Sequence, residues 1–206
     1  MKDDVLSPEA ARVLNFLGMM AMIGILLGAY GYQFWYRELP CTLCLLQRVA
    51  MMAVAVGAAM NVMLGPDPRH YAVCLVSAMF GITISIRQSL LHINPYFDTG
   101  AGKPTLLATT NPPFGQAVMG LDLYVWGVVI FGIVILSVGI VLLFRGQFRR
   151  VEQEPAWLIR LASIGVGILF AVAALETLTT FLECGFGDCP NDGSWNWWIF
   201  RAFKGA

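Results

Sequence analysis

Charged residues are scarce in this chain of 206 amino acids. Asp, Glu, Lys and Arg make up 13% of it and hydrophobic residues 58%, whereas about a quarter of a typical soluble domain is charged. Basic and acidic residues balance to a net charge of zero, so the composition gives no reason to expect a nucleic-acid partner. No polar stretch between the apolar runs is long enough to bury a core of its own. The composition therefore excludes a soluble globular protein and predicts an integral membrane protein that contacts lipid.

Histidine is also scarce, and its positions limit the possible metal chemistry. The two histidines, His70 and His92, would lie at opposite ends of one predicted helix, about 33 Å apart at about 1.5 Å per residue. Side chains at that distance cannot ligate the same iron, so a haem held by two histidines is excluded.

Five apolar runs are long enough to cross the hydrocarbon core of a bilayer, which requires about 20 helical residues. They cover residues 13–34, 45–64, 71–92, 121–144 and 157–182. The first run has no small-residue cleavage pattern after a short core, so we interpret it as a retained helix rather than a secretion signal. The predicted fold is an all-α integral membrane protein. It has a four-helix transmembrane bundle, a fifth transmembrane helix and an interfacial C-terminal tail, which form one domain over 1–206.

Basic residues indicate the orientation of these helices. Arg145, Arg149 and Arg150 share the short turn between the fourth and fifth runs, and positive residues favour the cytoplasmic side of a membrane. We therefore expect a cytoplasmic N-terminus. The loop 93–120 and the tail 183–206 should then lie on the extracytoplasmic side.

Four of the five cysteines form two close pairs. Cys41 and Cys44 precede the second run, and Cys184 and Cys189 follow the fifth. An even number of predicted crossings separates the pairs, so both must face the same compartment whichever way the chain is inserted. Cys74 lies within the third run, and we interpret it as a small buried hydrophobic residue.

The first pair has the spacing of a reactive disulfide. A Cys-x-x-Cys pair at the start of a helix closes a small ring, and the helix N-terminus and a nearby cation both stabilise a thiolate. Arg48 follows Cys44 by four residues and should lie on the same helix face. Three other interpretations stay open: a structural disulfide, two reduced buried thiols, or a zinc site formed by both cysteine pairs.

Polar residues around this pair have the chemistry to bind a membrane quinone. Arg87 and His92 lie near the end of the third run, on the same membrane side as Arg48 and Gln47. Their donors suit the carbonyl oxygens of a quinone, and Gln88 belongs to the same polar rim. The alternative for Arg48 is that its side chain extends to the membrane surface without a function.

Glu176 is the one acidic residue well inside the fifth run. Carboxylates within a membrane are usually paired or functional. We therefore expect Glu176 either to pair with a helix neighbour or a polar threonine, or to assist the protonation that accompanies quinone reduction.

The stretch "CTLCLLQR", followed by a second pair of closely linked helices, resembles the DsbB family of membrane thiol oxidoreductases. The resemblance covers about residues 10–145, and its specific part is Cys41, Cys44, Gln47 and Arg48. It implies a protein that takes electrons from a soluble periplasmic DsbA-like dithiol protein and passes them to ubiquinone or menaquinone. It also implies that Cys41 and Cys44 are the pair next to the quinone, and that Arg48 holds the quinone and favours the charge-transfer state. The implied location is the bacterial inner membrane, with the N-terminus cytoplasmic and the C-terminus periplasmic.

The second cysteine pair departs from the family pattern. Well-studied members carry it between the third and fourth helices, but the loop 93–120 contains no cysteine. We expect Cys184 and Cys189 to replace it as the partner-facing disulfide, because flexible exposed disulfides are readily exchanged. A local structural disulfide is the alternative for this pair. For the whole protein, the alternatives are a non-catalytic membrane scaffold and a quinol-driven disulfide reductase.

Overall fold

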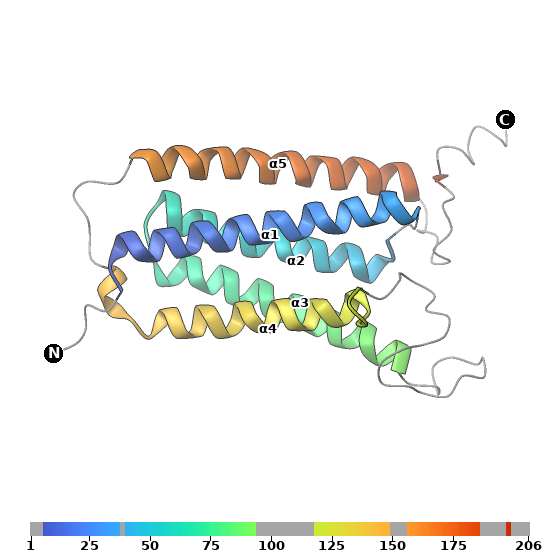
Figure 1. Ribbon diagram of the computed structural model, residues 1–206, viewed down its shortest axis with the longest axis horizontal. Coiled ribbons are helices and arrows are strands. Elements are labelled where there is room, and N and C mark those ends of the chain that lie inside the picture. The colour runs from blue at the N-terminus through green and yellow to red at the C-terminus, as the bar shows by residue number, and fades with distance from the viewer. Residues whose placement is uncertain (1–5, 38–39, 94–117, 149–155, 186–196, 199–206) are drawn as a thin grey trace.

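The computed structural model describes residues 6–37, 40–93, 118–148, 156–185 and 197–198, without the side chains of 91–93. These residues form five long α-helices and one short 3-10 helix (Figure 1). They are α1 (Pro8–Tyr36), α2 (Thr42–Met63), α3 (Pro68–Ile93), α4 (Leu123–Leu142), η1 (Arg145–Phe148) and α5 (Ala156–Cys184). All five long helices are apolar and long enough to span a membrane. The prediction of an all-helical membrane protein with five spans is thereby confirmed.

The helix ends follow from local capping. The first helix begins at Pro8 rather than at residue 13, because Ser7 caps it: the Ser7 hydroxyl accepts a hydrogen bond from the Ala10 amide at 3.2 Å. Proline at the first helical position also favours this start. The helix ends at Tyr36, and its C-cap residue Arg37 has a left-handed φ of 53° and an amide that donates to the Gln33 carbonyl. Both caps satisfy backbone groups that a helix end would otherwise leave unpaired.

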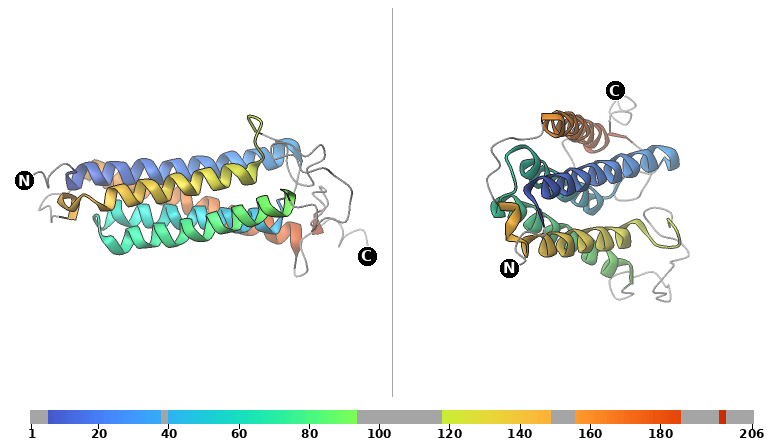
Figure 2. Two further views of the ribbon diagram at one scale, coloured as in Figure 1. Left: turned by 90° about the horizontal axis from the view of Figure 1, so that it is seen from below. Right: turned by 60° about the vertical axis from the view of Figure 1, so that its left-hand side comes forward.

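The helix α2 is central to the packing, since it contacts α1, α3 and α5. The helix α4 packs against α3, and α5 lies against α1 and α2 on the other side of the bundle (Figures 1 and 2). One close approach depends on glycine: a Cβ at Gly81 would lie 2.2 Å from the ring of Phe131, so the absence of a side chain lets α4 pack closely against α3.

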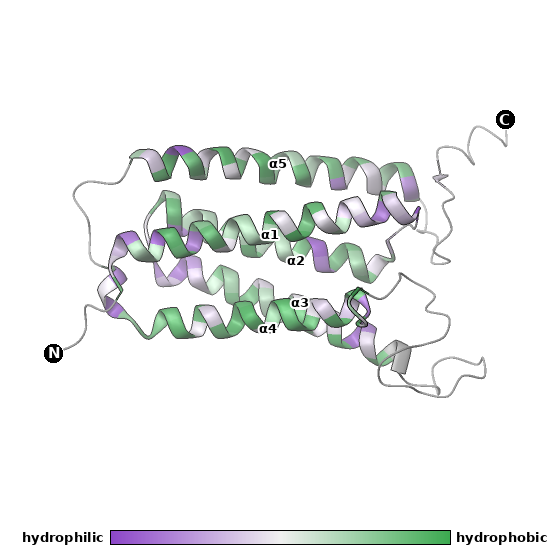
Figure 3. Ribbon diagram, in the orientation of Figure 1, coloured by the Kyte–Doolittle hydropathy of each residue, from purple (hydrophilic) through white to green (hydrophobic). Residues whose placement is uncertain are grey.

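Hydrophilic residues concentrate toward the two ends of the bundle, and the middle of the helices is mainly hydrophobic (Figure 3). The starts of α2 and α4 and the ends of α1, α3 and α5 lie together at one end, which we name the cysteine end (Figure 1). Cys41 and Cys44 at the start of α2 therefore share this end with Cys184, the last residue of α5. This arrangement agrees with the expectation from the number of crossings.

The other end of the bundle holds a buried polar network. The Asn15 amide donates to the Tyr71 hydroxyl at 2.7 Å, and the Tyr71 hydroxyl donates to Gln147 at 2.8 Å. The Asn61 amide donates to the Asn15 carbonyl oxygen at 3.0 Å. The network joins α1, α2, α3 and η1, so these four buried polar side chains are hydrogen-bonded to one another.

Most of the predicted loop 93–120 and of the tail 183–206 lies outside the described residues. Within the tail, the described Trp198 packs its ring against Phe181 of α5 at a centroid distance of 6.1 Å, and Trp197 lies 6.2 Å from Phe34 of α1. These two residues contact the bundle at the cysteine end. The interfacial placement of the tail stays a prediction.

Candidate active site

The site is built around the two cysteines at the start of α2. Cys41 is the N-cap residue of this helix, and its sulfur accepts a hydrogen bond from the Cys44 amide at 3.2 Å. Both residues are free thiols, with their Sγ atoms 2.7 Å apart. The cap geometry thus brings both sulfurs together at the positive end of the helix dipole, where a thiolate is stabilised.

The proton of this pair is unevenly shared. The hydrogen bond with Cys44, together with burial, raises the pKa of Cys41 above that of an ordinary thiol. When the pair loses one proton, Cys41 therefore keeps the remaining one. The negative charge then resides on Cys44, in the first turn of α2.

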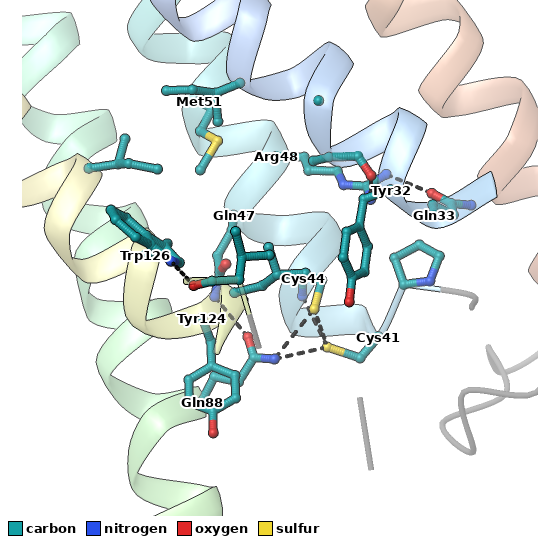
Figure 4. Close-up of a pocket in the computed structure, with 18 residues that line it drawn as sticks. Tyr32, Gln33, Cys41, Cys44, Gln47, Arg48, Met51, Gln88, Tyr124 and Trp126 are labelled. Atoms are coloured by element: carbon teal, nitrogen blue, oxygen red, sulfur yellow. Dashed lines mark hydrogen bonds between the residues drawn. The ribbon is translucent and has the colours of Figure 1, made fainter. Parts of the chain in front are cut away.

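An amide from α3 completes the surroundings of the sulfurs. The Nε2 atom of Gln88 donates to Cys41 and to Cys44, each at 3.3 Å (Figure 4). Gln47 on α2 fixes the orientation of this amide, because its own Nε2 donates to the Gln88 carbonyl oxygen at 2.8 Å. Gln88 is only 2% exposed, so its hydrogen bonds to sulfur are sheltered from water.

The cysteines border a cavity of about 330 Å³ between the helices. The helix α2 supplies Cys44, Gln47, Arg48 and Met51 to its wall, and Gln88 comes from α3 (Figure 4). The remaining described walls come from α1, α4 and the segments before α2 and α4. Their members include Ile25, Gly28, Ala29, Tyr32, Gln33, Pro40, Val118, Leu123, Tyr124, Trp126, Gly127 and Ile130. A mainly apolar wall with a few convergent polar groups is typical of sites for small ligands.

Arg48 is buried and paired rather than extended to the surface. It is 8% exposed, and its Nη1 donates to both carboxylate oxygens of Glu176, at 2.9 and 3.1 Å. The same nitrogen lies 2.9 Å from the Gln33 side-chain oxygen, and the guanidinium carbon lies 5.9 Å from the centre of the Tyr30 ring. Burial of this cation within the bundle is possible because Glu176 offsets its charge.

Gln33 connects this ion pair to a second carboxyl group. Its amide nitrogen donates to Glu183 at 2.5 Å, while its oxygen accepts from Arg48. We call Gln33, Arg48, Glu176 and Glu183 the arginine cluster. Glu176 and Glu183 are seven residues apart and thus lie on one face of α5. Sequence reasoning identified Glu176 as paired or functional, but it missed Gln33 and Glu183.

A match to a family model shows which family this chain belongs to. The family model described as "Disulfide bond formation protein DsbB" matches residues 11–141 of the chain. The chain belongs to the DsbB family. No curated protein and no solved structure matches it.

Membership of the DsbB family implies a role in disulfide bond formation and, typically for the family, oxidoreductase chemistry. The matched region contains the Cys41 and Cys44 pair and the cavity walls formed by α1 to α4. The helix α5 lies beyond the match, with both carboxylates of the arginine cluster and with Cys184.

Only some of the site residues predicted for this DsbB-family chain line the cavity in the described part of the structure. Arg87 is exposed on α3 and does not line the cavity, whereas its neighbour Gln88 does. His92 lies in the last turn of α3, but its side chain is outside the described part. Cys184 is buried and disulfide-bonded, and its partner sulfur is not among the described residues. Cys189 also lies outside them.

The disulfide at Cys184 bears on the zinc interpretation. A site of four cysteine ligands requires four thiolates. Since Cys184 is disulfide-bonded, its sulfur is not free to act as one.

Proposed function

We propose that this protein is a membrane thiol-disulfide oxidoreductase that takes electrons from an extracytoplasmic dithiol protein and passes them to a membrane quinone. The observation that carries this proposal is the position of Cys41 and Cys44. Their sulfurs lie 2.7 Å apart and border a mainly apolar cavity between candidate membrane-spanning helices. A disulfide that only held two segments together would have no need of such a cavity.

The cavity suits the head group of ubiquinone or menaquinone. Its volume of about 330 Å³ is within the range of about 300–1,000 Å³ that is typical of small-molecule sites. Gln47 and Arg48 would hold the polar edge of the ring, and Met51 and Trp126 its apolar faces. When bound, the quinone supplies an acceptor for two electrons and two protons. Residues of α1 and of α4 line the cavity. In the described part of the chain, these two helices do not pack extensively against each other.

The residues of this chain exchange disulfides in a defined order. A thiolate of the partner attacks the disulfide at Cys184, which breaks that bond and forms a mixed disulfide. The partner's second thiol attacks the mixed disulfide. This step oxidises and releases the partner, and it frees the thiol of Cys184. A freed sulfur of the tail pair, Cys184 or Cys189, then attacks Cys41 in the Cys41–Cys44 disulfide and releases Cys44 as a thiolate. The other tail sulfur attacks this second mixed disulfide, which re-forms the tail disulfide and releases the thiol of Cys41. Each attack breaks one S–S bond and forms one, and two electrons have passed to Cys41 and Cys44 once both mixed disulfides are resolved.

The proposed location is the bacterial inner membrane, with the cysteine end in the periplasm. Arg69, Arg145 and Arg160 lie toward the opposite end of the bundle, at the starts of α3, η1 and α5. Basic residues favour the cytoplasmic side. The cysteine end would then meet a DsbA-type partner protein in the periplasm.

Turnover by the purified full-length protein tests the proposal. A reduced DsbA-type protein and a short-chain ubiquinone analogue are mixed with the enzyme, and the loss of quinone absorbance is followed. We expect Cys44→Ser to abolish turnover. Cys74→Ser is the matched control, since Cys74 is a buried free thiol on α3 that does not line the cavity, and its sulfur donates to the Val54 carbonyl at 3.5 Å, a bond that serine can retain.

The same assay separates the alternatives. A Cys184→Ser variant should lose oxidation of the protein partner but retain quinone reduction by dithiothreitol, which reaches the first pair directly. Equal rates for wild type and Cys44→Ser would refute the proposal. A scaffold would show no turnover, and its cysteine variants would differ from wild type only in stability. A quinol-driven reductase would reduce an oxidised partner when supplied with quinol.

A further inference from the structure

The arginine of the cavity wall is paired by a helix that lies outside the family match. Glu176 belongs to α5, and its carboxylate approaches Arg48 to 2.9 Å. Cys44 and Arg48 are four residues apart on α2, and both line the cavity. Residues at this spacing are neighbours on one helix face. The charge that reaches Cys44 from Arg48 is therefore already offset by a carboxylate from α5.

We propose that Glu176 is a positioning residue that sets the reduction potential of the Cys41–Cys44 pair through Arg48. This inference rests on the proposed function, since it deals with the same redox pair. Glu176 offsets the charge of the guanidinium and holds it toward α1 and α5, where Gln33 and the Ala29 carbonyl also accept from it. The stabilisation that Arg48 gives to the Cys44 thiolate is weakened accordingly.

The effect on the redox equilibrium has a definite sign. Reduction of the Cys41–Cys44 disulfide takes up two electrons and yields one thiol and one thiolate, or two thiols when a second proton is bound. A group that stabilises the thiolate favours the reduced form and makes the disulfide more oxidising. By offsetting Arg48, Glu176 makes this pair less oxidising. Electrons that reach the pair then leave it more easily for the acceptor in the cavity.

Docking of α5 alone does not account for a buried ion pair at this position. Thr179 of α5 already accepts a hydrogen bond from the Tyr30 hydroxyl of α1 at 2.7 Å, and Glu183 binds Gln33. These contacts hold α5 against α1, and α5 also packs against α2 through apolar residues of the core. A buried ion pair adds little net stability over apolar packing, because both charges lose their hydration. Its electrostatic effect on neighbouring charges is large, because screening inside the bundle is weak.

The test is the equilibrium of the purified full-length protein with glutathione buffers, without quinone or protein partner. Alkylation followed by peptide mass spectrometry reports Cys41 and Cys44 separately from Cys184. We expect Glu176→Gln to shift the equilibrium constant about tenfold toward the reduced pair, which corresponds to about 30 mV. Glu176→Asp retains the charge and should stay within about twofold of wild type.

Thr179→Val is the matched structural control. It removes a buried polar contact between α1 and α5 one turn from Glu176 without changing the charge, so the equilibrium constant should stay near that of wild type. A shift in Glu176→Gln no larger than in Thr179→Val, or a shift toward the oxidised pair, would overturn the inference.

A double variant keeps the test decisive if the uncompensated arginine prevents folding. In an Arg48→Gln background, Glu176→Gln should leave the equilibrium constant within about twofold, because the mediating charge is gone. An undiminished shift in that background would show that Glu176 does not act through Arg48. Quinone turnover plays no part in these measurements. Its failure would refute only the proposed function, whereas an unchanged potential with intact turnover would refute only the role of Glu176.

Discussion

Replacing Gln88 by methionine would remove the amide that donates to both sulfurs while keeping a similar side-chain length. Hydrogen bonds to a charged group contribute about 1.5–3 kcal/mol. The two bonds of Gln88 are each 3.3 Å long and are divided between Cys41 and Cys44, so the lower end of that range is appropriate for the thiolate. About 1.4 kcal/mol corresponds to a tenfold change in an equilibrium. We therefore expect the ionisation constant of the reduced pair to fall about tenfold, and the thiolate population to fall by the same factor at a pH at which most of the pair is protonated.

The assay is the rate at which iodoacetamide modifies Cys44 in the reduced, detergent-solubilised protein, because only the thiolate reacts. Ser89→Ala is the control on the same helix, since the Ser89 hydroxyl donates to the carbonyl of Ser85 and not to a sulfur. This variant should react at the wild-type rate. If Gln88→Met reacted as fast as the control, the amide would have no influence on the thiolate, and the assignment of Gln88 to the site would fail.

Three further predictions concern stability and pH. Arg48→Met should destabilise the protein by about 3–5 kcal/mol, because it leaves a carboxylate buried without its cation, and the double change with Glu176→Leu should recover most of that loss in thermal unfolding. Gly81→Ala should lower the free energy of unfolding by about 1–3 kcal/mol in the same assay, because the added methyl group would lie 2.2 Å from the ring of Phe131 on α4. Unaltered stability would contradict this packing. Alkylation of Cys41 should be slow at neutral pH, because its pKa is raised, and Cys44→Ala should lower that pKa by removing the hydrogen bond that is the main cause. An alkylation profile of Cys41 that kept its alkaline midpoint in Cys44→Ala would show that burial alone raises the pKa.

The sequence predicts the fold well because each membrane-spanning helix is a local feature. A long apolar run identifies a span by itself, and the number of spans fixes which cysteines share one side. The rotation of a helix about its axis is less apparent. Charge and membrane side favour Arg87, but the buried positions of α3 recur at spacings of three and four residues that include Gly81, Ser85 and Gln88. That pattern, followed along the run, favours Gln88 over Arg87 within the predicted polar rim.

The neighbours of a helix are still harder to infer from sequence. The sequence predicts that Glu176 pairs with a helix neighbour or a threonine, or assists protonation, and its partner in the structure is Arg48 on α2. The two residues are 128 positions apart in the chain, and no periodicity relates them. Which helices meet depends on the packing of the whole bundle, so the pair becomes visible only once α5 is placed against α1 and α2.

The position of α5 relates the two parts of the site that the family match separates. One rigid helix carries Glu176 against Arg48, Glu183 against Gln33, and Cys184 at its last residue. An exchange between the disulfide at Cys184 and the Cys41–Cys44 pair requires their sulfurs to approach closely. Any displacement of the end of α5 in that step acts first on Glu183, which is next to Cys184 in the chain, and then on Glu176 two turns earlier. In the proposed exchange, the contacts of Arg48 and Gln33 with α5 are therefore mechanically joined to the segment that would deliver electrons to the cavity.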